Sequence, residues 1–150
     1  MPKRSKARAL ALQIVFQLEA QSESFLGHVD GFAEEAGLEK SLNRYGRELA
    51  QQAWEHRAQA DELINNFAKD WTAASMPAVD RAILRLALCE MLHREDVPDK
   101  VAIDEAIELA KTYSTKDSSK FINGILDAVL KDKAARDEGA ALVNQSDEQE

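Results

Sequence analysis

The sequence predicts an all-α protein. Apolar residues recur at helical spacing in every long segment of the 150-residue chain, and no segment shows the alternation of apolar and polar residues that is typical of a strand. Only 3 prolines and 6 glycines interrupt these patterns, which leaves room for long helices. A hydrophobic content of 45% is enough to build the core of one ordinary domain.

Three helices are expected in the first half of the chain. Ser5 can cap the first of them, and Gly37 is placed to end the second. Gly46 lies inside the third and weakens it by roughly 1 kcal/mol. The expected ranges are residues 5–20, 28–36 and 41–69. The first helix carries one apolar stripe, formed by Ala7, Leu10, Ala11, Ile14, Val15 and Leu18.

Three more helices are expected in the second half, over residues 77–93, 99–113 and 117–132. The first of these is apolar on most of its circumference, which is typical of a central buried helix. The predicted shared core consists of Ile83, Leu86, Ala87, Ile103, Ile107, Ile122, Ile125 and Leu126. We expect one domain over residues 1–133, divided near Trp71 into subdomains of about 1–70 and 71–133.

Charge is distributed unevenly along a chain whose net charge is -8. Lys3, Arg4, Lys6 and Arg8 form a basic N-terminal segment, whereas residues 134–150 are mostly acidic and polar and are expected to be disordered. No apolar run approaches the roughly 20 residues that span a bilayer, and no apolar signal-peptide core follows the basic residues. A cytoplasmic protein without a membrane partner is therefore expected.

No arrangement of residues in the sequence indicates catalysis. His28, His56 and His93 lie far apart on unrelated segments, so neither a metal nor a cofactor is expected. Cys89 lies in the most apolar helix, where an inert core thiol is the favoured interpretation. Phosphate-binding and nucleophile-elbow motifs are missing from the sequence. We therefore expect a binding protein, not an enzyme.

Three features have both a structural and a functional interpretation. The basic segment is either a frayed terminus or a phosphate-binding surface, since cations at a helix start are otherwise unfavourably placed. Phe16 lies on a row with Arg8 and Leu12 beside the main stripe, and spacing alone favours a core position for it over a contact surface. Gly124 would usually mark close helix packing, although Lys120 and Phe121 next to it fit single-stranded RNA.

Two stretches in the last third carry a resemblance to a known family. Residues 101–111, VAIDEAIELAK, and residues 117–127, DSSKFINGILD, resemble the C-terminal signature of the NusB family of transcription antitermination factors. Residues 82–90 and the segment ALQIVF over residues 11–16 are also similar, and the likeness covers about residues 4–131. It implies two packed three-helix bundles. It also implies binding of boxA RNA together with NusE, a ribosomal small-subunit protein, within an antitermination complex on RNA polymerase, notably on ribosomal RNA operons.

The resemblance also implies roles for particular residues. For RNA it implicates the basic segment and the start of the last helix, namely Lys3, Arg4, Lys6, Arg8, Asp117, Lys120 and Phe121. For NusE it implicates Phe16, Asp80 and Arg85, and some family members self-associate to a homodimer through that surface. Departures from the family pattern are Ser5, Lys6 and Ala9, and Phe16 in place of the more usual tyrosine.

Two alternative functions remain open at this stage. A protein-only adaptor that has lost RNA binding would agree with Ser5 and with the negative net charge. A small helical enzyme is the other alternative, and a bound metal or cofactor would be its sign.

Overall fold

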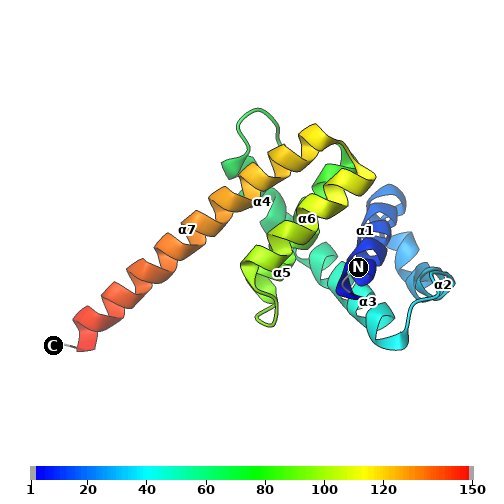
Figure 1. Cartoon of the computed structure of the whole chain (residues 1–150), viewed down its shortest axis with the longest axis horizontal. Helices are drawn as coiled ribbons and strands as arrows, with labels where there is room; N and C mark the ends of the chain where they lie inside the picture. Colours follow the sequence, from blue (N-terminus) through cyan, green and yellow to red (C-terminus); the bar gives the residue numbers. More distant parts are fainter. Residues whose placement is uncertain (1–2, 149–150) are drawn as a thin grey trace.

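The computed structural model describes residues 3–148, with side chains over residues 4–139, and within that range it is all-α. The longer helices are packed into one body, from which the end of the last helix projects (Figure 1). The helices are α1 (Lys3–Gln21), α2 (Val29–Glu35), α3 (Lys40–Glu55), α4 (Arg57–Phe67), α5 (Ala78–His93), α6 (Asp99–Tyr113) and α7 (Lys116–Glu148), with the 3-10 helix η1 (Ser22–His28) between α1 and α2.

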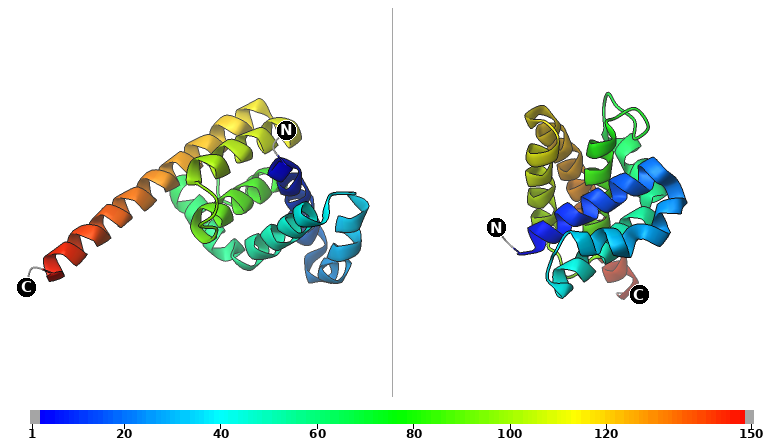
Figure 2. Two further views of the ribbon diagram at one scale, coloured as in Figure 1. Left: turned by 60° about the horizontal axis from the view of Figure 1, so that its bottom comes forward. Right: turned by 90° about the vertical axis from the view of Figure 1, so that its right-hand side faces the viewer.

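The helices form two packed bundles. The first contains α1, α2 and α3, and the second contains α5, α6 and α7. Helix α5 packs against α1 and α3 as well as against α6 and α7, so it joins the two bundles (Figure 2). This arrangement explains why α5 is apolar around most of its surface, because every side of it meets another helix.

The predicted core is confirmed with one exception. Seven of the eight expected residues are buried, and Ile107 is partly buried against the same core. All six residues of the α1 stripe are buried as well. Gly37 ends the α2 region with φ +68°, the left-handed conformation that favours glycine at this position.

The single helix predicted over residues 41–69 was wrong. The chain breaks at His56, with φ -97° and ψ 15°, into α3 and α4. Helix α4 then packs against α5 and α7 as well as α3, and the division into subdomains near Trp71 stays a prediction. No proline or glycine marks the break; the His56 ring stacks on His93 of α5, with centroids 3.9 Å apart. Tertiary packing therefore decides the turn.

Gly46 of α3 lies in close contact with α1. A Cβ atom there would lie 2.8 Å from the Ala7 carbonyl oxygen, which is too close for any other residue without a backbone shift. The glycine that the sequence marks as a weak point thus permits the contact on which the first bundle depends. Gly124 is the reverse case, because a Cβ atom added there would meet no atom within 4 Å, so the expected packing role was wrong.

The ends of the chain differ from the prediction. Helix α1 already begins at Lys3, so Ser5 lies inside the helix and does not cap it. Helix α7 continues to Glu148 instead of ending near residue 132. Alanines of high helix propensity favour this continuation, as does the pair between Arg136 and Asp132 at 3.0 Å.

Over the described range, no helix is long and apolar enough to cross a membrane.

Candidate RNA and partner interface

The start of α1 presents two accessible cations. Lys6 is exposed, and the Arg4 side chain is 46% exposed. Arg4 Nη2 lies 3.3 Å from Asp96 Oδ2, and the guanidinium carbon lies 4.4 Å from the centre of the Tyr45 ring. The predicted role of Lys3 falls on a side chain outside the described ones. Arg4 and Lys6 are thus available to a polyanion, although Arg4 already has an acidic neighbour.

Arg8 does not belong to this accessible group. Its Nε and Nη2 donate to the two oxygens of Glu90 at 2.8 and 2.9 Å, and both side chains are almost fully buried. The Tyr45 hydroxyl donates to Glu90 at 2.6 Å; burial, followed by Glu90, raises the pKa of Tyr45 to about 12. The Arg8 donors are therefore satisfied inside the protein, and its phosphate contact stays a prediction that would require this pair to open.

The start of α7 is a second exposed region. Asp117 and Lys120 are exposed, whereas Phe121 is half-buried with its ring centre 5.1 Å from that of Trp71 at an angle of 62°. Trp71 is 41% exposed, and the two aromatics line a hollow of about 360 Å³. Thr115 caps the helix by accepting a hydrogen bond from the Ser118 backbone N–H at 2.9 Å.

Trp71 was missed by the sequence reasoning. Its position in a turn gave it no helical pattern, and its distance along the chain from Phe121 hid their contact. Only its aromatic character in a polar connection could have indicated a role.

Asp80 supports the α7 start from within instead of facing a partner. Its side chain is completely buried and accepts hydrogen bonds from Ser114 Oγ at 2.6 Å and Ser118 Oγ at 2.8 Å. It therefore holds the α6–α7 connection against the first turn of α5. The direct contact of Asp80 with a protein partner stays a prediction, and the structure gives this residue an internal role beside it.

Arg85 is likewise internal. Its Nε and Nη2 donate to the Asp61 carboxylate at 2.9 and 2.7 Å, and its Nη1 lies 3.6 Å from Glu19. Glu19 also pairs with Arg81. Arg85 thus ties α5 to α4 and α1, and its contact with a partner stays a prediction.

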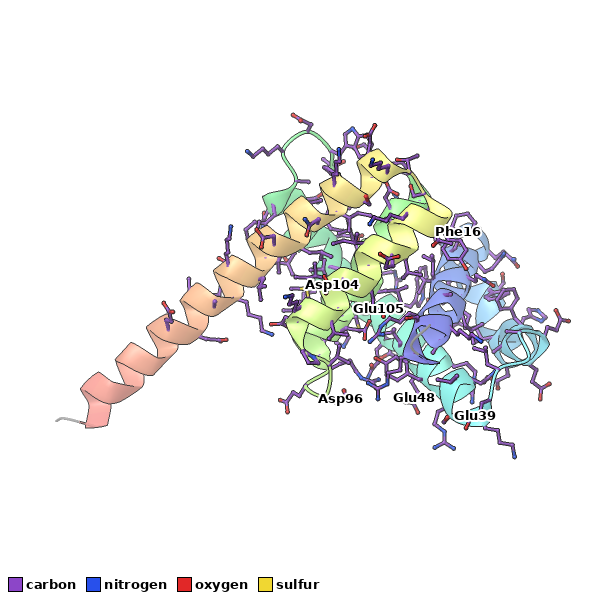
Figure 3. The ribbon with its side chains drawn as sticks, viewed as in Figure 1. Phe16, Glu39, Glu48, Asp96, Asp104 and Glu105 are labelled. Carbon is purple, nitrogen blue, oxygen red and sulfur yellow. The ribbon has the colours of Figure 1, made fainter. Side chains whose placement is uncertain are left out.

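Phe16 has the position expected of a contact surface. It is 38% exposed and lines a groove of about 230 Å³ with Phe32, Val79 and Tyr113 (Figure 3 labels Phe16). The core position favoured by its spacing was wrong, because the row beside the main stripe leaves the packed interface before it reaches Phe16. The groove adjoins the α7 start, since Val79 precedes Asp80.

The two cationic regions do not come together. Arg4 lies beside the turn that leads into α6, whereas α7 begins after the opposite end of α6. A helix of 15 residues separates them, which corresponds to roughly 20 Å. A ligand that touches both must be extended along one side of the molecule.

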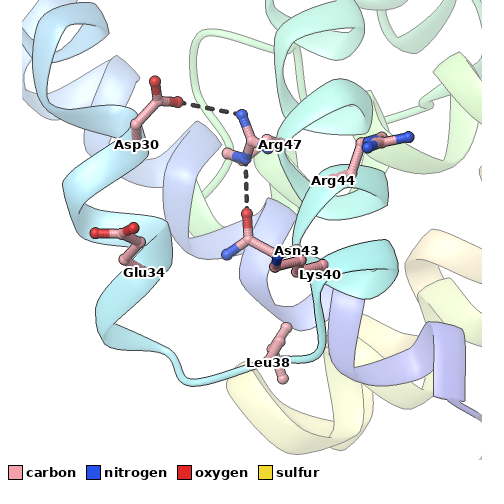
Figure 4. Close-up of a pocket in the computed structure, with 7 residues that line it drawn as sticks. All are labelled: Asp30, Glu34, Leu38, Lys40, Asn43, Arg44 and Arg47. Carbon is pink, nitrogen blue, oxygen red and sulfur yellow. Dashed lines mark hydrogen bonds and ion pairs between the residues drawn. The ribbon is translucent and has the colours of Figure 1, made fainter.

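A further hollow of about 490 Å³ lies between α2 and α3 (Figure 4). Its lining is of mixed charge, and in Figure 4 Arg47 reaches toward Asp30 of α2, whereas the Arg44 side chain points away from Asp30 and Glu34. Arg47 donates to Asn43 Oδ1 at 2.7 Å and to Asp30 Oδ1 at 3.3 Å. Three cations, Lys40, Arg44 and Arg47, and two carboxylates line the hollow, and the pairing of Arg47 with Asp30 compensates part of this charge.

The Cys89 thiol does not have the character of a nucleophile. It is buried in α5, and this burial raises its pKa to about 12. No group of three or more potential metal ligands occurs among the described side chains.

The fold and the exposed groups define a class: a small all-α binding protein with an aromatic and cationic end and an apolar groove. The NusB family model matches residues 5–131. The transcription antitermination protein NusB of Symbiobacterium thermophilum is 45% identical over 136 residues, which cover 85% of this chain and 89% of the relative. That of Desulfitobacterium hafniense is 40% identical, covering 90% and 93%. The chain belongs to the NusB family of transcription antitermination proteins.

Solved structures agree with this assignment. NusB of T. maritima superposes with a TM-score of 0.75 at 34% identity, covering 87% of this chain and 92% of that one. A crystal structure of the antitermination factors NusB and NusE in complex with dsRNA gives a TM-score of 0.78 at 23% identity, covering 87% and 98%. The second likeness concerns the fold alone.

Proposed function

We propose that this protein binds boxA RNA as a heterodimer with NusE and helps to assemble an antitermination complex on RNA polymerase in the cytoplasm, notably on ribosomal RNA operons. The observation that carries the proposal is the pair of exposed Trp71 and half-buried Phe121 beside exposed Lys120. Single-stranded RNA is commonly held by stacking aromatics together with cations that neutralise its phosphates.

The RNA surface in this proposal has two parts. Lys120, Phe121 and Asp117 at the start of α7 contact bases and the adjoining backbone. Lys3, Arg4 and Lys6 at the start of α1 contact phosphates farther along the strand. Their separation along α6 fits an extended single strand better than a compact ligand.

The NusE surface in this proposal is the groove around Phe16. Apolar and aromatic side chains line it, and such exposed apolar patches are typical of protein-binding sites. Asp80 and Arg85 act indirectly, because they fix the helices on which the groove is built. Self-association of two copies through this groove would compete with NusE.

A protein-only adaptor remains the second candidate. The net charge of -8 and the pairing of Arg4 with Asp96 both oppose RNA binding at the α1 start. A titration of fluorescent boxA RNA with the protein, with and without NusE, separates the two candidates. Saturable binding that NusE strengthens is expected, while binding of NusE without any binding of RNA would favour the adaptor.

A further inference from the structure

Asp96 is shared by two arginines in the turn between α5 and α6. Its Oδ2 lies 3.3 Å from Arg4 Nη2, and its Oδ1 lies 3.5 Å from Arg94 Nε. One carboxylate thus bridges guanidinium groups from two separate parts of the chain. Figure 3 shows Asp96 at the tip of this turn, below Asp104 and Glu105 of α6.

Tyr45 holds the same two arginines in place. Its ring centre lies 4.4 Å from the guanidinium carbon of Arg4 and 4.8 Å from that of Arg94. The ring itself is fixed, because it is buried and its hydroxyl donates to Glu90 at 2.6 Å. Arg94 is fixed further by donating from Nη1 to Gln52 Oε1 at 3.1 Å. Both cations are therefore preorganised before any ligand arrives.

The hold of Asp96 on this pair is weak. The Asp96 side chain is 51% exposed. Its contacts with Arg4 and Arg94 are longer than the hydrogen bonds of 2.8 and 2.9 Å between buried Arg8 and Glu90. Partial desolvation raises the pKa of Asp96, but the charges of Arg94 and Arg4 outweigh this and leave it below its usual value. Asp96 is thus a charged, solvent-accessible counterion that another anion can replace.

We infer that Arg4 and Arg94 form a clamp for one backbone phosphate of RNA, and that Asp96 occupies this clamp in the free protein. The inference rests on the RNA-binding function proposed above and adds Arg94 to its contacts. A phosphate presents paired anionic oxygens to guanidinium groups as a carboxylate does. Binding at the clamp therefore requires displacement of Asp96, which makes this residue an internal competitor of RNA.

The surroundings restrict where that phosphate can lie. Arg4 and Asp96 line a hollow of about 540 Å³, but Asp104 and Glu105 line it as well. These two carboxylates repel an anion placed deep in the hollow. The phosphate accordingly binds at the rim, beside the Tyr45 ring, where the two arginines meet.

The substitution Asp96→Asn tests the competition. Removal of the competing charge is expected to tighten boxA RNA binding in the presence of NusE by roughly two- to fivefold, the range for an exposed ion pair. Glu95→Gln is the control, because it makes the same change in net charge in the same turn and, among the described side chains, Glu95 forms no ion pair with either arginine. Fluorescence anisotropy gives the affinities, and circular dichroism checks that both variants fold.

A double-variant cycle assigns the effect to the clamp. Arg94→Gln alone is expected to weaken RNA binding. The gain in RNA affinity from Asp96→Asn is expected to be much smaller in the Arg94→Gln background than in the wild-type background. Equal gains from Asp96→Asn and Glu95→Gln would overturn the inference, as would no gain from Asp96→Asn. If wild type with NusE does not bind boxA RNA at all, the proposed function itself fails, and this outcome is distinct from the other two.

Discussion

At the scale of single residues, Arg8 shows that a charged residue in a basic stretch of sequence need not lie on the protein surface. It belongs to a run of cations that looks like a binding segment, yet it makes a paired contact with Glu90 under Tyr45. A buried ion pair contributes little net stability as a pair, but loss of one member leaves the other charge buried and unpaired.

Arg8→Ala is expected to destabilise the protein by about 3–5 kcal/mol, because Glu90 would remain charged in the core. Urea unfolding followed by circular dichroism measures this change. Lys6→Ala, an exposed change in the same helix, is expected to leave stability nearly unaltered. If Arg8→Ala left stability unchanged and weakened RNA binding, Arg8 would have to be assigned to the RNA-binding surface.

Two glycines give a paired test of close packing. Gly46→Ala is expected to lower stability, because the new methyl group meets the Ala7 carbonyl oxygen at 2.8 Å. Gly124→Ala is expected to raise stability by up to about 1 kcal/mol, because alanine favours the helix and the added methyl group meets no atom within 4 Å. Thermal unfolding of both variants measures the difference, and equal effects would mean that the α1–α3 approach can relax.

At the scale of elements, the start of α7 and the side of α1 present different surfaces. The first holds Trp71 against Phe121, and the second exposes Phe16 over an apolar groove. The α7 start depends on a buried polar contact behind it, since Asp80 fastens it to α5.

Trp71→Ala and Phe16→Ala are expected to have opposite effects on the two ligands. Loss of one stacking aromatic weakens RNA binding by about 1–3 kcal/mol, so Trp71→Ala should reduce boxA affinity and spare NusE. Phe16→Ala should weaken NusE binding by at least about 1 kcal/mol, as for an interface anchor. Calorimetry measures NusE binding, and fluorescence anisotropy measures RNA binding. If Trp71→Ala weakened only NusE binding and Phe16→Ala weakened only RNA binding, the two surfaces would have been assigned the wrong way round.

The stacked histidines at the α3–α4 break predict a pH dependence of stability. Burial, and then the charge of His56, lowers the pKa of His93 below the unfolded value of about 6.5. The unfolded chain therefore binds more protons in this window, so stability is full above about pH 6.5 and falls as the pH is lowered through it. Melting temperatures of wild type and His93→Gln across this range test the effect, which the variant should reduce; parallel curves would contradict it.

At the scale of the whole molecule, the proposed function requires an acidic protein to bind a polyanion through local cations. Arg4, Lys6, Arg94 and Lys120 line an extended path in the two proposals, while the net charge is -8. Such binding depends strongly on salt, because each neutralised phosphate releases bound counterions.

Three phosphate contacts, because Arg4 and Arg94 share one phosphate, predict a slope of log K against log salt of about -2, at roughly -0.7 for each phosphate of a single strand. The double substitution of Arg4 and Lys6 by alanine should flatten this slope by about 1.4. NusE binding should be preserved, because the Phe16 groove lies farther along α1. An unchanged slope would mean that the α1 start does not touch phosphate.

The sequence by itself determined the fold class, most of the core and the family. Periodicity identifies the buried faces of α1, α5, α6 and α7 because it depends only on which side of a helix is apolar. The family signature occupies contiguous residues, so it too is legible without contacts.

Only the tertiary structure decided which polar and aromatic residues reach the surface. The break at His56, the burial of Arg8, Asp80 and Arg85, and the pairing of Trp71 with Phe121 each depend on a partner from another helix. The local sequence pattern does not identify these partners. A charge looks alike in sequence whether it faces water or a buried counterion, and only packing distinguishes the two.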